Sequence, residues 1–378
     1  MTIAIDASRA AGTQKTGIGW YCHHLLAYLK DAIPHDVRVV LYTDQALPEE
    51  LRPWRSNWEE RVLTRRGPMW SQLVLAHAVL RDQPDVFFVP AHVIPFALAL
   101  APRSRRPKLV TTIHDVVFRE FPETYSPRER WYADHATRLA VRHADRIVVP
   151  TRHVARELER YYRCDPEKVA VIHHGVESRI MNKELWGNTT MSPSFMIPNS
   201  LFILYVGRLE HKKNVVRMVE AFTAIASRHP HVRLVLAGSP GYGHEEVMAA
   251  IARSPVADRI ATPGWIDRAQ YHQLLASSTV FLFPTLGEGF GLPIIEAFAA
   301  GAPVITSTGG AHEEVSGGAA LLVSATDGRA IADALDRLLS DDRLRQNLVE
   351  RGRHRAEEFT WDRSAARTWE ALKSVLSP

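Results

Sequence analysis

The stretch VFLFPTLGEGFGLPIIEAFAAGAPVITS, residues 280–307, contains a complete strand–helix–strand pattern. The apolar run VFLFPT predicts a strand, and the glycines that follow it predict a turn. Pro293 suits the first turn of a helix and Gly301 suits the end of it, after which APVITS predicts a second strand. A strand, a crossover helix and another strand form the unit from which parallel sheets are built.

Similar apolar runs occur along both halves of the 378-residue chain. They lack the polar alternation of a half-exposed strand, which is typical of strands covered by helices on both faces. The ranges expected to form strands are 2–8, 37–43, 85–90, 108–115 and 145–151, then 202–208, 232–238, 259–264, 280–285, 302–307 and 319–324. The sequence therefore predicts an α/β fold with two doubly wound, Rossmann-like parallel sheets.

The strand–helix alternation stops near residue 180 and then restarts, which predicts two domains. We expect an N-terminal domain over 1–183 and a C-terminal domain over 201–358. The segment 184–200 is rich in Asn, Ser, Thr and Pro and is typical of a linker. Residues 359–378 predict an amphipathic helix. We expect this helix to cross back to the N-terminal domain, and a plain C-terminal helix is the alternative.

Composition narrows the class of protein. Two cysteines are too few for a disulfide framework, so we expect a cytoplasmic protein. No apolar run reaches membrane-spanning length, and no aromatic-rich basic stripe favours nucleic-acid binding. Residues 1–184 carry 27 Lys and Arg against 22 Asp and Glu, whereas the remainder carries 19 against 20. The basic first half, with an Arg-rich helix over 152–163, favours peripheral contact with an anionic inner membrane; a solvated helix face is the alternative.

Two carboxylates flank the glycine-rich turn. Ligands of open parallel sheets bind beyond the carboxyl ends of the strands, where this turn lies. Glu288 offers only acceptors, which suits sugar hydroxyls, and the backbone N–H groups at the helix start suit an anion. Glu296, one turn into an apolar helix, needs a hydrogen-bond partner, which a ribose would provide. The order of sugar, diphosphate and ribose describes a nucleotide sugar, and two ordinary surface glutamates are the alternative.

Two cations follow another predicted strand, at Arg208 and Lys213. Fixed cations would stabilise a departing diphosphate, each charge-assisted contact contributing about 1.5–3 kcal/mol. The chain has no Asp-x-Asp pair of the kind that holds a divalent ion on a diphosphate. We therefore expect neither a metal nor another cofactor.

The chain resembles the retaining glycosyltransferases of family 4, through motifs that span nearly its whole length. The matching pieces are TGIGW (16–20), TIHD (112–115), HHGV (173–176), GRLEHKK (207–213), GWI (264–266) and EGFGLPIIE (288–296). The resemblance implies a GT-B fold, in which two Rossmann-like domains face a central cleft. It also implies transfer of a sugar with retention of the anomeric configuration.

The resemblance implies a role for each matched residue. His114, Arg208, Lys213 and Glu288 would be catalytic, with His114 facing the donor sugar. The donor would be held by Gly17, Gly207, Arg208, Lys213, Gly238, Ile266, Glu288, Gly289, Phe290, Gly291, Leu292 and Glu296. Arg208 and Lys213 would hold the diphosphate, and Ile266 would meet the nucleobase through its backbone. Gly19 and Asp115 would lie near the acceptor, although Gly19 also suits a helix-start turn and Asp115 a turn cap.

These implications give a hexosyltransferase, with mannose favoured over glucose and GDP or UDP as the donor nucleotide. We expect the acceptor to be a saccharide or a lipid-linked saccharide, in cell-surface polysaccharide or lipopolysaccharide biosynthesis. The alternatives are a nucleotide-sugar-binding protein without transferase activity, a nucleotide-sugar epimerase and a sugar phosphorylase.

Overall fold

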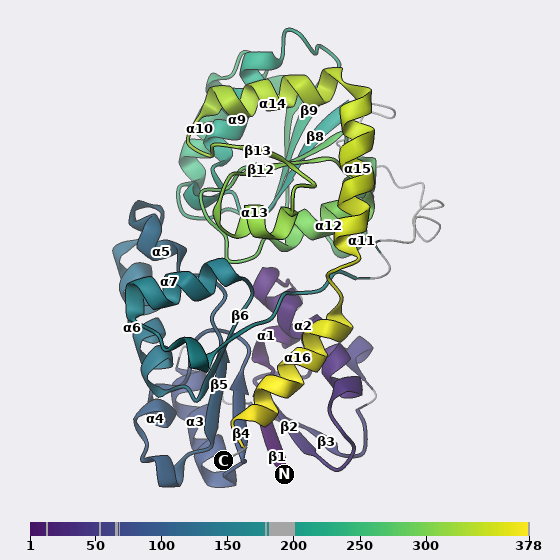
Figure 1. Ribbon diagram of the computed structural model, residues 1–378. Helices are drawn as coiled ribbons and strands as arrows, with labels where there is room; N and C mark the ends of the chain where they lie inside the picture. Colours follow the sequence, from purple (N-terminus) through teal and green to yellow (C-terminus); the bar gives the residue numbers. More distant parts are fainter. Residues whose placement is uncertain are drawn as a thin grey trace. The chain divides into compact units, whose positions relative to one another are not determined.

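Two compact units make up the computed structural model of this chain (Figure 1). The structure describes residues 1–378 except 13, 53, 65, 66, 68, 178, 179, 181–200, 377 and 378. Unit 1 comprises Met1–Arg119, Arg128–Gly175 and Thr360–Pro378, and unit 2 comprises Glu120–Pro127 and Val176–Phe359. The predicted linker, 184–200, lies outside the described residues.

Unit 1 contains a seven-stranded parallel sheet in the order β3-β2-β1-β4-β5-β6-β7. Its strands are β1 (Thr2–Asp6), β2 (Arg38–Thr43), β3 (Trp58–Val62), β4 (Val86–Val89), β5 (Lys108–Thr112), β6 (Arg146–Val149) and β7 (Val169–Val171). The longer helices are α2 (Gly17–Ala32), α3 (Ala76–Asp82), α6 (Pro127–His143), α7 (Arg152–Tyr162) and α16 (Trp361–Ser374); α1 (Ser8–Ala11), α4 (Phe96–Leu100) and α5 (Val117–Glu120) are short. α16, the last helix of the chain, packs against α2.

Unit 2 contains a six-stranded parallel sheet in the order β10-β9-β8-β11-β12-β13. Its strands are β8 (Leu201–Val206), β9 (Val232–Ala237), β10 (Ile260–Gly264), β11 (Val280–Phe283), β12 (Val304–Ser307) and β13 (Leu321–Val323). Its helices are α9 (Val215–Ile225), α10 (His244–Arg253), α11 (Arg268–Ser277), α12 (Leu292–Ala300), α13 (Gly310–Ser316), α14 (Gly328–Ser340) and α15 (Asp342–Ala356).

Both sheets follow the strand order of the doubly wound fold, so the predicted fold class is confirmed for each unit. In unit 2 the chain steps from β8 to β10 in one direction and then returns to β11 on the other side of β8. Because parallel crossovers are right-handed, this reversal sends the connecting helices to opposite faces of the sheet. The loops that leave β8 and β11 therefore lie next to each other at the switch point, where open α/β sheets bind their ligands, before their helices go to opposite faces.

Buried apolar strands explain why the sequence pattern identified the sheet of unit 2. β9 is buried over five of its six positions, and β11 and β12 are buried throughout. α12 between them is buried along most of its length, from Ile294 to Ala300. Glu296 is the charged residue within that buried run, so its carboxylate needs hydrogen-bond partners.

Candidate functional site

Two loops of unit 2 lie together at the switch point of its sheet. The loop after β8 runs from Gly207 to Asn214, and the loop after β11 runs from Pro284 to Gly291. The Leu286 N–H donates to the Lys212 carbonyl at 2.9 Å, and the Asn214 side-chain amide donates to the Pro284 carbonyl at 2.9 Å. These bonds fix the side chains of one loop relative to those of the other.

Lys213 and Glu288, predicted on separate loops, form an ion pair in the structure. Their side chains are 15% and 13% exposed, so the pair is more shielded than an ordinary surface pair. The Lys213 ammonium also lies 5.6 Å from the centre of the Phe283 ring. A strand-end aromatic ring and a loop carboxylate thus hold the cation at the carboxyl edge of the sheet.

Arg208 lies at the same edge and is more accessible. Its side chain is 54% exposed, and its Nη1 atom lies 3.4 Å from the largely buried Glu210 carboxylate. The backbone before it is tightly packed, because a Cβ atom at Gly238 would lie 1.9 Å from the Gly207 carbonyl oxygen. Gly238 has a φ of +150°, which side-chain-bearing residues rarely adopt. The ends of β8 and β9 can therefore approach each other because the residues that follow them, Gly207 and Gly238, are glycines.

The glycine-rich turn leads directly into α12. Gly291 precedes the helix with a φ of +91°, and Leu292 and Pro293 form its first turn. No side chain of the described residues caps this helix start, which leaves its N-terminal dipole available to an anion. Phe290 points into the core, with its ring 5.7 Å from that of Phe359. Gly289, Phe290 and Gly291 are all buried, so this part of the turn packs against the protein and its aromatic side chain anchors it.

Glu296 has protein partners where the sequence suggested a ribose. Its Oε1 atom accepts a bond from Arg268 Nη2 at 2.7 Å, and its Oε2 atom accepts one from the Tyr271 hydroxyl at 2.5 Å. Arg268 also pairs with Glu177. The sequence analysis missed both partners of Glu296 and also the pairing of Arg268 with Glu177. The available signal was the capping box of Asp267 and Gln270, which begins α11 and places Arg268 and Tyr271 one turn apart.

Ile266 lies between β10 and α11, just beyond the carboxyl end of β10. Its side chain is partly buried and packs against the core of unit 2. Gly264 turns the chain there with a φ of +78°, and its carbonyl accepts a bond from the Gly238 N–H at 2.8 Å. The contact of Ile266 with a nucleobase stays a prediction.

The predicted residues of unit 1 follow β1 and β5. Gly17 begins α2 in an exposed position. Gly19 is buried, and a Cβ atom at this position would lie 3.1 Å from the Lys15 side chain, which is a tight contact. Asp115 Oδ1 accepts a bond from the Val117 N–H at 3.2 Å, as a turn cap does. The acceptor roles of Gly19 and Asp115 stay predictions.

His114 is buried in unit 1, and its described hydrogen bond is to backbone. Its Nε2 atom lies 2.8 Å from the Pro90 carbonyl oxygen, which can only accept, so Nε2 carries the proton. The rings of Tyr21 and His174 lie 4.8 Å and 5.7 Å from that of His114. Burial lowers the pKa of His114 to about 4, which keeps the imidazole neutral near pH 7.

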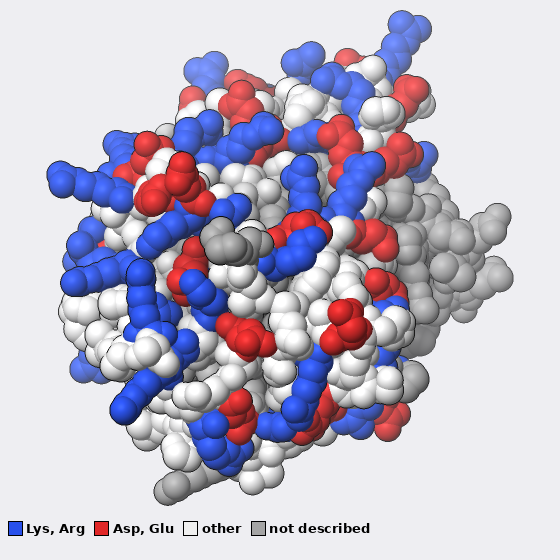
Figure 2. Space-filling model, turned by 60° about the horizontal axis from the view of Figure 1, so that its bottom comes forward, with Lys and Arg blue, Asp and Glu red and all other residues white. Residues whose placement is uncertain are grey.

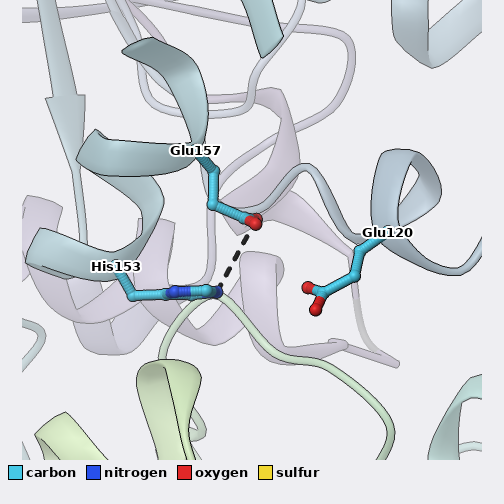
Figure 3. A group of neighbouring side chains, drawn as sticks. All are labelled: Glu120, His153 and Glu157. Carbon is cyan, nitrogen blue, oxygen red and sulfur yellow. Dashed lines mark ion pairs between the residues drawn. The ribbon is translucent and has the colours of Figure 1, made fainter. Parts of the chain in front are cut away.

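The Arg-rich helix of the sequence analysis is α7. Thr151 caps it by accepting a bond from the Val154 N–H at 3.2 Å. His153 and Glu157 form an i, i+4 pair at 3.6 Å on it (Figure 3); Glu120, also drawn there, belongs to unit 2. The helix and its C-cap expose four arginines, at Arg152, Arg156, Arg160 and Arg163.

Charge is mixed on the face drawn in Figure 2, where red carboxylates lie among the blue Lys and Arg side chains. The structure also has a cavity of about 550 Å³, lined in part by Arg345, Arg353 and His354 of α15. Ser278 and Pro303 line it too, and they precede β11 and β12, so the cavity lies at the amino ends of the strands. It is therefore separate from the candidate site at the carboxyl ends.

No helix among the described residues combines the length and the apolar character that a membrane crossing requires.

Comparisons with known proteins match both halves of the chain. The family model described as Glycosyltransferase Family 4 matches residues 15–179, and the one described as Glycosyl transferases group 1 matches residues 190–355. The chain is 26% identical to O-antigen chain mannosyltransferase B of Escherichia coli over 83% of this chain and 78% of that protein. It is 31% identical to D-inositol 3-phosphate glycosyltransferase of Streptomyces scabiei (strain 87.22), over 62% of this chain and 55% of that protein.

Among solved structures, the sucrose-phosphate synthase (tll1590) of Thermosynechococcus elongatus is similar in fold. It superposes with a TM-score of 0.79 at 18% identity, and the match covers 99% of each chain.

Proposed function

Because the chain belongs to the family 4 glycosyltransferases, as its sequence motifs predicted, we propose that it transfers a hexose from a nucleotide diphosphate sugar. The acceptor that we propose is a saccharide or a lipid-linked saccharide, in the synthesis of a cell-surface polysaccharide or lipopolysaccharide. Mannose is the favoured sugar, and glucose is the alternative.

One observation carries this proposal, namely the pairing of Lys213 with Glu288 at the switch point of the unit 2 sheet. The pair offers a cation for a phosphate and, next to it, a carboxylate for sugar hydroxyls. Arg208 adds a second cation at the same edge, and the uncapped start of α12 adds backbone N–H groups. Together these groups match a diphosphate joined to a sugar.

The chain's own residues supply the charge stabilisation that the reaction needs. The bond between the anomeric carbon and the diphosphate oxygen breaks, and the electron pair leaves with the diphosphate. Arg208, Lys213 and the α12 amides stabilise that growing negative charge, so no metal ion is required. The acceptor oxygen then bonds to the anomeric carbon from the same face, which retains the configuration. Its proton passes to the departing phosphate.

The favoured sugar rests on one relative. The mannosyltransferase of E. coli is similar over most of both chains, which supports mannose as the transferred hexose. GDP is the donor nucleotide that we propose. The nucleobase would lie near the Gly264–Ile266 turn, where UDP is the alternative.

Peripheral contact with the cytoplasmic face of the inner membrane is part of the proposal. The exposed arginines of α7 support it, since lysines and arginines near an anionic membrane surface contribute about 1 kcal/mol each. Sedimentation with vesicles of anionic phospholipid, with and without the substitution of Arg152, Arg156 and Arg160 by Gln, tests it. Equal sedimentation of both proteins would contradict the role of α7.

Two measurements test the proposed activity. Thermal unfolding with UDP, GDP, ADP and their sugars identifies the nucleotide by the largest rise in Tm. Release of that nucleotide from the sugar donor, with and without an oligosaccharide acceptor, then measures transfer. Donor binding without any nucleotide release would favour a binding protein, and conversion of the donor sugar without release would favour an epimerase.

A further inference from the structure

Arg268 and Tyr271 of α11 together hold the one carboxylate that lies within the buried part of α12. Arg268 occupies one oxygen of Glu296 at 2.7 Å, and the Tyr271 hydroxyl occupies the other at 2.5 Å. Glu296 is 7% exposed and Tyr271 is 7% exposed, so this contact is shielded from water. Both donors come from a single helix that begins with a two-way capping box, which fixes their spacing.

The charges of this cluster determine which groups donate. Burial on its own would lower the pKa of Arg268, but Glu296 and Glu177 more than offset it and the pKa is raised. Burial and the neighbouring Glu296 raise the pKa of Tyr271 well above its usual value. Arg268 is therefore a cation and Tyr271 a protonated phenol at neutral pH, and both act as donors to the Glu296 carboxylate.

A carboxylate has about four acceptor positions, two on each oxygen. One protein donor on each oxygen uses two of them and leaves two, one on each oxygen, for the donors of a ligand. Two vicinal hydroxyl groups are donors whose spacing matches the two oxygens of one carboxylate. The carboxylate is thus pre-organised for a diol, with no need to reorganise when the diol arrives.

We infer that Arg268 and Tyr271 are positioning residues that orient Glu296 toward the 2′- and 3′-hydroxyls of a nucleotide ribose. Through this orientation they set a preference for ribonucleotides over 2′-deoxyribonucleotides. The inference rests on the proposed function, because it requires that a nucleoside diphosphate binds at the carboxyl edge of the unit 2 sheet.

Glu177 gives Arg268 a second anchor. It lies one residue after Val176, where the chain enters unit 2, and it binds Arg268 through Nε at 2.9 Å as well as through Nη2. Nη2 of Arg268 thus donates to both Glu177 and Glu296, and the additional Nε bond to Glu177 fixes the plane of the guanidinium. Glu177→Gln should therefore reduce the ribose preference less than a substitution of Arg268 does.

The test measures the dissociation constants of UDP and GDP and of their 2′-deoxy forms by titration calorimetry. The variants are Tyr271→Phe, which keeps the ring, and Arg268→Lys, which keeps the charge but loses the fork geometry. Arg329→Gln serves as the matched control, because Arg329 is 91% exposed on α14. Circular dichroism and Tm establish that each variant is folded.

The expected result is a loss of about tenfold in ribonucleotide affinity for Tyr271→Phe and Arg268→Lys, with little change in 2′-deoxynucleotide affinity. The ratio of the 2′-deoxynucleotide dissociation constant to the ribonucleotide dissociation constant then falls toward one in these two variants. In Arg329→Gln this ratio stays at the wild-type value. A purely structural role would weaken both forms by the same factor, and that outcome would overturn the inference while leaving the proposed function intact. If the wild-type protein binds no nucleoside diphosphate, the proposed function fails, and the inference fails with it.

Discussion

The ammonium group of Lys213 contacts the carboxylate of Glu288, although 75 residues separate them in the sequence. The contact forms because the loops after β8 and β11 meet at the switch point of the sheet. Each group neutralises the charge of the other. A ligand that carries both an anion and hydroxyl groups can bind Lys213 through the anion and Glu288 through the hydroxyls. Neither charged group is then left without a partner when the ion pair opens.

Lys213→Gln should lower turnover by about 100- to 1,000-fold, since removal of one group that stabilises transition-state charge typically costs this much. The measurement is kcat with a saturating nucleotide sugar. Lys373→Gln is the matched control, because Lys373 forms a similar pair with Glu370 that is half exposed on α16. Near wild-type turnover of Lys213→Gln would remove the lysine from the mechanism.

Arg208→Ala should reduce kcat strongly and the KM of the acceptor little, because the arginine would contact the departing diphosphate rather than the acceptor. Arg228→Ala is a suitable control, since the Arg228 side chain is 55% exposed, close to the 54% of Arg208, and pairs with Asp336. A rise in acceptor KM with unchanged kcat would instead place Arg208 at the acceptor.

Gly238→Ala should lower the free energy of unfolding by more than about 2 kcal/mol, because the added Cβ atom meets backbone and the residue has a positive φ. The displaced Gly207 carbonyl would also move Arg208, so nucleotide binding should weaken. Chemical unfolding and calorimetry measure the two effects. Gly328→Ala, where a Cβ atom meets nothing within 4 Å, should leave both unchanged.

Acid should destabilise unit 1 through His114. The unfolded imidazole binds a proton near pH 6.5, whereas burial lowers the pKa of the folded one to about 4. The unfolded state thus binds more protons between these values, and stability falls as the pH drops from about 6.5 toward 4, by up to about 3 kcal/mol. His174, whose pKa burial also lowers, adds to this effect.

The measurement is Tm against pH for the wild type, for His114→Gln and for His354→Gln, in which an exposed histidine is replaced. The decline of Tm with falling pH should be smaller in His114→Gln than in the wild type. In His354→Gln it should equal that of the wild type. An identical decline in His114→Gln would show that His114 does not titrate in this range.

In unit 1 the strands that the sequence predicted are those with neighbours on both sides, whereas in unit 2 the edge strands β10 and β13 were predicted as well. Strands β3 (WEERV, Trp58–Val62) and β7 (VAV, Val169–Val171) escaped prediction, and they are the two edges of the unit 1 sheet. An edge strand needs no continuous apolar run, since one side of it faces no other strand. β3 carries three charged residues for this reason, and its pattern resembled a loop.

The candidate site was predictable where it depends on topology. Lys213 and Glu288 each follow a predicted strand, so the parallel sheet alone brings their loops to one edge. The partners of Glu296 depend instead on which side of α11 faces α12, and on the entry of the chain at Glu177. The capping box of Asp267 and Gln270 places Arg268 and Tyr271 on one helix, but the spacing of residues does not show that this side of the helix faces α12.

The final helix of the chain belongs to the first unit. The Trp361 side chain at its start is almost fully buried, and its backbone lies against Gly175, where a Cβ atom would come within 2.2 Å of it. A ribosome makes the chain from the N-terminus, so unit 2 is fully synthesised before the last piece of unit 1 emerges. Unit 1 is thus the first unit to begin folding and the last that can complete it. In a nascent chain that ends at Phe359, the place in unit 1 that the Trp361 side chain occupies would be unfilled.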